Sequence, residues 1–141
     1  MGKRRKARER AMQYLYRLDL LPAEQRLIPE ELNTLTTENG KTIDQPFAED
    51  LISGVIANLP QIDGLIQGAA ERWEIGRMAM IDKTILRIAV YEILYHRETD
   101  TAVIINEALE IAKRYSTADS ASFINGILDK IARQARRGGD Q

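Results

Sequence analysis

Apolar residues recur at helical spacing along most of this chain. The first apolar face consists of Ala7, Ala11, Leu15 and Leu18, spaced four, four and three residues apart. This spacing places them on one side of a helix. Tyr14 lies beside that face, whereas Tyr16, two residues further on, points elsewhere. We therefore expect Tyr14 in the core and Tyr16 closer to the surface.

The same period predicts helices along the rest of the chain. They are expected over residues 47–59, 62–73, 77–96, 103–115 and 123–131, with a weaker pattern over 23–38. Residues 36–42, which contain Asn39-Gly40, are typical of a turn. The segment 77–96 is apolar around most of its circumference, so this helix is expected at the centre. Because no long stretch alternates with strand period, the chain is predicted to be all-α, with about seven helices.

Short sequence signals set the expected helix ends. Pro22 and Pro60 are expected to end or kink the helices before them, because proline lacks the amide hydrogen that a helix interior needs. Asp44 followed by Pro46 indicates a helix start, and Asp100, with Thr99 before it, is a candidate N-cap. Ser116 and Thr117 are expected to open the last helix.

Charged residues inside the predicted helices suggest local ion pairs. Arg87, in the most apolar helix, is expected to pair with a neighbouring acid such as Glu92. Glu107 and Glu110 precede Lys113 on the next helix, and this spacing indicates ion pairing on the surface.

Length and composition are those of an ordinary soluble domain. The 141 residues, 44% hydrophobic and 29% charged, are expected to form a single domain over residues 1–141. The absence of cysteine excludes disulfides and thiolate metal sites. No apolar run approaches the roughly 18 residues that span a bilayer, and the charged N-terminus lacks the apolar segment of a signal peptide. The expected location is the cytoplasm, with no membrane contact.

The chain offers little of the chemistry that enzymes need. Its one histidine, His96, lies at a predicted helix end, where it is expected to interact with the helix dipole rather than with substrate. The sequence contains no nucleophile elbow, phosphate-binding loop or dinucleotide fingerprint. We therefore expect no catalytic residues, no cofactor and no bound metal.

Charge is distributed unevenly along the chain. The first seventeen residues carry seven basic side chains and one acid, an excess of six positive charges, whereas the chain as a whole carries −1. A basic end on an acidic body favours a polyanionic partner, although an end that only aids solubility would have the same composition. We expect residues 1–6 to form a flexible basic arm and residues 133–141 a frayed tail.

Four stretches carry a resemblance to a known family. They are Ala7-Arg8-Glu9 with the Ala11–Tyr16 segment, the segment from Ile81 to Glu92, the segment from Ile105 to Tyr115, and Phe123-Ile124-Asn125-Gly126-Ile127-Leu128-Asp129. In this order the chain closely resembles the NusB family of bacterial transcription antitermination factors, from the basic arm to about Ala132. Two departures stand out: many members have a proline where this chain has Asp100, and residues 27–43 match no family motif.

The resemblance implies a fold, a function and partners. The fold would be a NusB-like bundle of two helical subdomains. The protein would bind the boxA element of ribosomal RNA leader transcripts together with the small-subunit ribosomal protein NusE. The pair would join an RNA polymerase complex that resists termination.

The resemblance also implies site residues. For RNA binding, the matching positions are Arg4, Arg5, Arg8, Asp119, Phe123 and Asn125. For docking of the protein partner, they are Tyr16 and Asp82. Phe123 fits both a core face and base stacking, and its residue pattern does not choose between them.

Other functions remain open from the sequence. A helical protein-interaction module that binds no RNA itself would also suit an acidic body with Tyr16 exposed. NusB-like domains also occur fused to RNA cytosine methyltransferases, but this chain has no cofactor-binding βαβ pattern. The sequence leaves open whether two copies form a homodimer.

Overall fold

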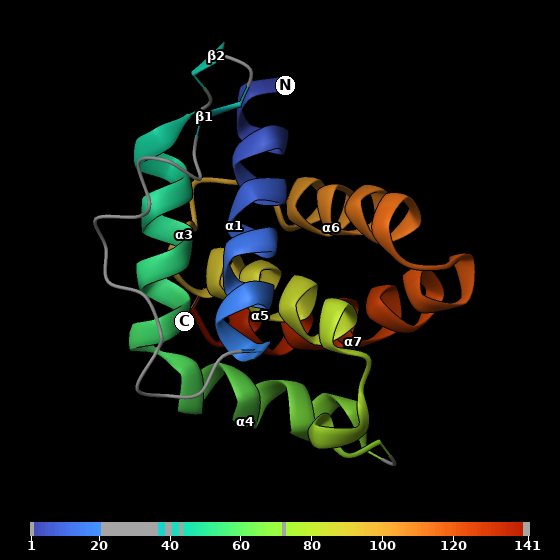
Figure 1. Cartoon of the computed structure of the whole chain (residues 1–141). Helices are drawn as coiled ribbons and strands as arrows, with labels where there is room; N and C mark the ends of the chain where they lie inside the picture. The colour runs from blue at the N-terminus through green and yellow to red at the C-terminus, as the bar shows by residue number, and fades with distance from the viewer. Residues whose placement is uncertain (1, 21–36, 39–40, 43, 72, 140–141) are drawn as a thin grey trace.

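The structure is a computed structural model that describes residues 2–20, 37–38, 41–42, 44–71 and 73–139. Its helices are α1 (Gly2–Leu20), α3 (Gln45–Ala57), α4 (Leu59–Ala70), a short 3-10 helix η3 (Ile75–Arg77), α5 (Met80–Tyr95), α6 (Thr101–Tyr115) and α7 (Ala118–Gly139). Two-residue strands β1 (Thr37–Glu38) and β2 (Lys41–Thr42) pair antiparallel on either side of residues 39–40. The described part of the chain is thus a helical bundle with one minimal hairpin (Figure 1).

Helix α5 is the centre of the bundle, as its apolar circumference predicts. It packs against α1, α3, α4 and α7, and also against α6. Figure 1 shows α1 and α3 side by side, with α4 crossing below them and α6 and α7 on the other side of α5. The largest fully buried side chains include Leu51, Ile62, Leu86, Ile104 and Leu128, one each from α3, α4, α5, α6 and α7.

Several predicted helix ends are confirmed. The carboxylate of Asp44 accepts a hydrogen bond from the Phe47 amide at 3.3 Å and caps α3, with Pro46 in the first turn. Asp100 occupies the N-cap position of α6. The Thr117 hydroxyl accepts from the Ser120 amide at 3.0 Å at the start of α7. The side chains of Asp44 and Thr117 each satisfy an amide that the first helical turn leaves without a partner, whereas the Asp100 side chain makes no capping hydrogen bond.

Three expectations about segment ends differ from the structure. Residues 2–6, expected to be an arm, form the first turns of α1, and α7 continues to Gly139 through residues expected to fray. Whether residues 2–6 and the end of α7 are mobile stays a prediction. Helix α4 ends at Ala70, so Trp73 lies beyond it and is exposed instead of sharing its apolar face. The weaker helix predicted over 23–38 lies outside the described residues, apart from the two that form β1.

Arg87 pairs with acids, as predicted, but Glu92 is not among them. Its guanidinium forms bidentate hydrogen bonds to Asp63 of α4 at 2.8 Å and a further bond to Asp19 of α1 at 3.0 Å. Burial tends to lower the pKa of Arg87, but these two carboxylates outweigh it and raise the pKa. Arg87 therefore joins three helices, whereas Glu92, five residues further along α5, lies on another face of that helix and pairs with Arg8.

Helices α3 and α5 approach each other closely at Gly54. A Cβ atom placed there would lie 2.1 Å from the Cζ atom of Tyr91. The Tyr91 hydroxyl donates a hydrogen bond to Asp50 at 2.9 Å, and His96, the C-cap of α5, lies 2.5 Å from the other oxygen of the same carboxylate. In the last turn of α5, the Ile93 carbonyl accepts a hydrogen bond from the Arg136 guanidinium at 3.1 Å.

Candidate nucleic-acid interface

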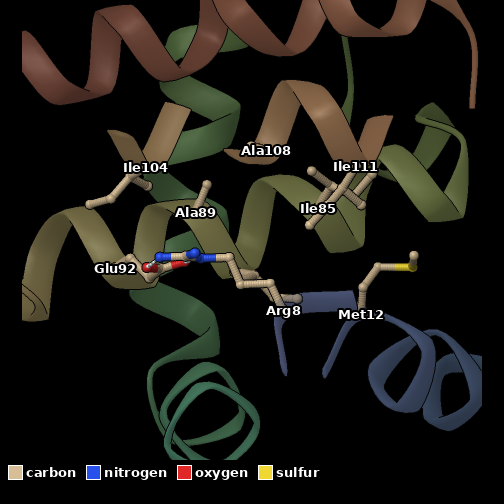
Figure 2. A pocket seen from close by; sticks show the side chains of 9 residues that line it. Arg8, Met12, Ile85, Ala89, Glu92, Ile104, Ala108 and Ile111 are labelled. Atoms are coloured by element: carbon tan, nitrogen blue, oxygen red, sulfur yellow. Dashed lines mark hydrogen bonds and ion pairs between the residues drawn. The ribbon is translucent and has the colours of Figure 1, made fainter. Parts of the chain in front are cut away.

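Arg8, the deepest of the three arginines expected to bind RNA, is enclosed by the protein. Its side chain is only 6% exposed, and its guanidinium donates two hydrogen bonds of 2.8 Å to Glu92 of α5. Figure 2 shows this pair lying across the floor of a small apolar cavity lined by Ile85, Ile104 and Ile111. Buried charges need such a partner, because an unpaired charge in an apolar interior is very costly. Arg8 therefore joins α1 to α5 in this structure.

Arg5 forms the next contact along α1. Its Nε and Nη2 atoms donate to the two oxygens of Glu107 on α6, at 3.0 and 2.6 Å. These hydrogen bonds raise the pKa of Arg5 and lower that of Glu107. Glu107 is buried and lies 3.5 Å from Arg8, so it does not form the surface ion pair predicted for it. The surface pair does form at Glu110, 3.6 Å from Lys113.

Arg4 is the most accessible of the three. Its side chain is 48% exposed, and its Nε atom lies 3.7 Å from a carboxylate oxygen of Asp44. The guanidinium stands 4.3 Å above the centre of the Phe47 ring, a cation–π contact. Both contacts are at the surface and weak, so Arg4 can exchange them for phosphate contacts at little cost.

Contacts between α1 and α6 extend this basic surface. Glu9 lies 3.2 Å from the Arg114 guanidinium, and its other oxygen accepts from Tyr115 at 3.4 Å. Lys6 and Arg10 are four residues apart on α1 and so share a face. We call Lys6, Arg10 and Arg114 the basic ridge. Arg114 is 65% exposed and stands in the last turn of α6.

A second feature lies where α7 begins. A pocket of about 240 Å³ is lined by Trp73, Arg77, Met78, Ala79, Asp82, Asp119, Ser120 and Phe123. Asp119 is exposed, and Phe123 is half-buried, packed against the core on one side and lining the pocket on the other. Asn125 is exposed on the same helix. The fold thus brings Asp119 and Phe123 together, one turn apart on α7.

The positions expected to dock a protein partner differ in exposure. Tyr16 is half-buried, as the helical period predicted, whereas Asp82 is 6% exposed. One Asp82 oxygen accepts from the Ser120 hydroxyl at 2.8 Å, and the other, Oδ1, has no hydrogen-bond partner among the described residues. In this structure Asp82 joins the start of α5 to the start of α7, beneath the surface.

Helix α6 lies between the arginines of α1 and the pocket at Phe123. Arg5 contacts Glu107 in the middle of α6, and Glu9 contacts Arg114 at its end. Helix α7 begins at Ala118, three residues after α6 stops. The charged contacts between α1 and α6 therefore run from the middle of α6 to its end, and the pocket at Phe123 lies just beyond, where α7 begins.

Sequence reasoning missed several residues of this surface. Glu92 and Glu107 are acids within apolar helical faces, a signal that marks buried partners for the arginines of α1. Trp73 and Arg77 gave no such signal, because they lie in the connection before α5 and meet Phe123 only through the fold.

The described residues contain neither a candidate metal-binding site nor a candidate membrane-spanning helix. No group of three or more histidine, cysteine or carboxylate side chains among them could hold a metal ion. None of the helices described combines the length and the apolar content needed to cross a membrane.

The fold and surface define an all-helical bundle with a basic face along α1 and α6. The model of the NusB family matches residues 5–133, and the chain belongs to the NusB family. It is 46% identical to the transcription antitermination protein NusB of Geobacter sulfurreducens over 132 residues, covering 94% of this chain and 95% of that protein. The NusB of Thermodesulfovibrio yellowstonii is 45% identical over 140 residues, with 94% and 93% covered.

Solved structures agree with this assignment. The structure of NusB from T. maritima superposes with a TM-score of 0.84 at 33% identity, covering 98% of this chain and 97% of that one. A crystal structure of antitermination factors NusB and NusE in complex with double-stranded RNA contains a chain that matches with a TM-score of 0.77 at 22% identity, with 95% and 98% covered. The second similarity concerns the fold alone.

Proposed function

We propose that this chain is an RNA-binding transcription antitermination factor of the bacterial cytoplasm and not an enzyme. It binds an unpaired RNA of boxA type together with the ribosomal protein NusE, and the complex acts on RNA polymerase. The observation that carries the proposal is that α1 and α6 carry Arg4 and the basic ridge, while the aromatic pocket at Phe123 lies where α7 begins, directly after α6. Cations that track a backbone and aromatic rings that meet bases are the two elements of single-strand binding.

The site residues have different roles in this proposal. Arg4, and Arg5 where RNA displaces Glu107, contact phosphates, while Asp119, Phe123 and Asn125 meet the RNA at the start of α7. Arg8 supports this surface from below, because its guanidinium is already satisfied by Glu92. Tyr16 remains the candidate for partner docking, and Asp82 acts by fixing the start of α7 through Ser120.

The first experiment measures RNA affinity and its salt dependence. A labelled boxA-type RNA and a scrambled RNA are titrated by fluorescence anisotropy, with and without NusE, at several salt concentrations. The double variant Arg4→Ala/Lys6→Ala is expected to reduce the slope of log K against log salt by about 1.4, because each single-strand phosphate contact contributes about 0.7.

Arg133→Ala is the matched control. Arg133 is 71% exposed on α7, and in the part of the chain that the structure describes its one ion pair is with Asp129, one turn away, so its removal changes net charge without touching the proposed surface. An unchanged slope in the double variant, or an equal loss in the control, would contradict the assignment. Equal affinity for both RNAs in the presence of NusE would contradict boxA recognition.

One observation favours a second function. Arg5 and Arg8 are both held by carboxylates, which leaves fewer free cations than the sequence suggests. A protein-interaction module that binds NusE and contributes no RNA contact would fit these contacts. Partner binding that is retained while no RNA binding is detected, alone or with NusE, would establish it.

A further inference from the structure

Trp73, the only tryptophan of the chain, is exposed yet firmly held. Its side chain is 56% exposed in the connection between α4 and η3. The Gln67 side chain holds this connection at two points, because its Nε2 donates to the Trp73 carbonyl at 2.7 Å and its Oε1 accepts from the Ile75 amide at 2.8 Å. The Trp73 amide also donates to the Ala70 carbonyl at 3.3 Å. A large apolar side chain is thus presented to solvent on a fixed backbone.

The end of α4 stores conformational strain next to this residue. Glu71 has a φ of 55° and is the only non-glycine residue with positive φ in the described part of the chain. Such a conformation costs free energy and persists only where the surroundings hold it, most often near functional sites. Here Lys130 of α7 forms an ion pair with Glu71. The ion pair between Glu71 and Lys130 thus ties the connection that carries Trp73 to α7.

The exposed indole borders the pocket at Phe123. The two ring centroids are 6.0 Å apart at an interplanar angle of 75°, so the rings meet edge to face and do not cover each other. One aromatic face therefore stays open to a ligand. The volume, about 240 Å³, is below the roughly 300–1,000 Å³ of sites for drug-sized molecules, so it suits a group of the size of one ring.

The charged side chains around the pocket would orient a bound nucleotide, because they attract its phosphate at one place and repel it at another. Arg77 lines the pocket, is exposed, and pairs with no carboxylate among the described residues. The carboxylates of Asp82 and Asp119 line the same pocket and repel phosphate. A nucleotide would therefore turn its base toward the aromatic rings and its phosphate toward Arg77. A free cation beside an exposed ring disfavours a basic side chain from a protein partner at the same place.

We propose that Trp73 is a stacking platform for one unpaired RNA base and that Arg77 holds the phosphate of the same nucleotide. The inference rests on the proposed RNA-binding function and adds two residues to it. Aromatic stacking tolerates any base, so this contact contributes affinity and not sequence preference.

The single tryptophan gives a direct test. Unlabelled boxA-type RNA, with NusE at saturation, is titrated while the tryptophan emission of the chain is followed, and anisotropy of labelled RNA reports binding in parallel. The same titration on Trp73→Phe supplies the blank. Stacking is expected to quench the Trp73 emission with the same midpoint as the anisotropy change.

Variants separate stacking from a structural role. Trp73→Ala is expected to weaken RNA binding about 5- to 150-fold, the range that stacking covers, without changing the salt slope. Trp73→Phe, which keeps an aromatic face, is expected to retain most of the affinity. Arg77→Ala is expected to reduce the salt slope by about 0.7. Tyr95→Ala removes another exposed aromatic ring at the far end of α5 and is expected to change neither quantity.

Each alternative outcome has a definite meaning. Binding seen by anisotropy with unchanged Trp73 emission and normal affinity of Trp73→Ala would overturn the stacking proposal and leave the proposed function intact. An emission change caused by NusE alone, with no further change on adding RNA, would also overturn it, because the pocket would then hold protein. Absence of any RNA binding by the unaltered complex would refute the proposed function itself.

Discussion

Replacing Arg8 tests whether this arginine serves the fold or the RNA. Glu92 is 1% exposed, and Arg8 supplies both of its side-chain hydrogen bonds, so Arg8→Ala would leave the charge of a buried carboxylate unpaired. Removing one partner of a buried pair costs about 3–5 kcal/mol. This is a large part of the roughly 5–15 kcal/mol that stabilises a typical domain. For a chain of this size we expect the melting temperature to fall by about 10–20 °C.

A second variant distinguishes the two roles. Arg8→Met/Glu92→Met removes both charges and fills the space with apolar side chains beside the isoleucines of the small cavity. Exchanging a buried ion pair for apolar residues is often neutral or stabilising, so the double variant should regain most of the lost stability. Arg5 keeps its own partner, Glu107, in both variants.

Two measurements complete the test. Thermal unfolding followed by circular dichroism gives the stability of each variant, and anisotropy at several salt concentrations gives the RNA affinity of the folded double variant. We expect that affinity and its salt slope to equal those of the unaltered chain. A double variant that is stable but has lost RNA affinity and part of the salt slope would refute the argument, since Arg8 would then contact RNA directly.

Three further predictions concern neighbouring contacts. Gly54→Ala should destabilise the protein by about 1–3 kcal/mol in urea unfolding, because its methyl group would overlap the Tyr91 ring; a neutral result would contradict the close approach. Burial and the hydrogen bond to Asp50 raise the pKa of Tyr91 to about 12, so its contribution to stability should be complete below pH 10 and be lost as the pH rises toward 12. Burial also raises the pKa of Tyr115, so alkaline difference spectra should show a late-titrating phenol signal that becomes smaller in Tyr91→Phe, and an unchanged late signal in that variant would contradict the assignment. Asp44→Asn keeps the N-cap of α3 and releases Arg4, so RNA affinity should rise up to about 5-fold, and a double-mutant cycle with Arg4→Ala should abolish the gain.

Helix period and caps predicted much of this fold because both are local. Residues three and four apart share a helix face whatever surrounds them, so Tyr14 was placed in the core and Tyr16 nearer the surface without any tertiary information. The central position of α5 followed from its apolar circumference. The end of α4 was misjudged because Trp73 continues the apolar spacing, while Glu71 leaves the helix in a conformation that sequence period does not record.

The candidate site was predicted only in part. The cluster of arginines and the Phe123 region were identified by composition and resemblance, but their environments were not. Arg4 and Arg8 are four residues apart on one helix, and one is half exposed while the other is enclosed. This difference depends on Glu92, 84 positions away, which meets Arg8 through the packing of α1 on α5.

The sequence by itself determined the all-helical class, most helix boundaries, the basic N-terminal end and the family. These depend on interactions within a few residues, or on motifs that stay in register along the chain. The tertiary structure decided which charges are exposed, which acid pairs with which arginine, and that Trp73 and Arg77 meet Phe123 at one pocket. The physical reason is that ion pairing and burial depend on distances through space, and those distances are set only when the helices pack.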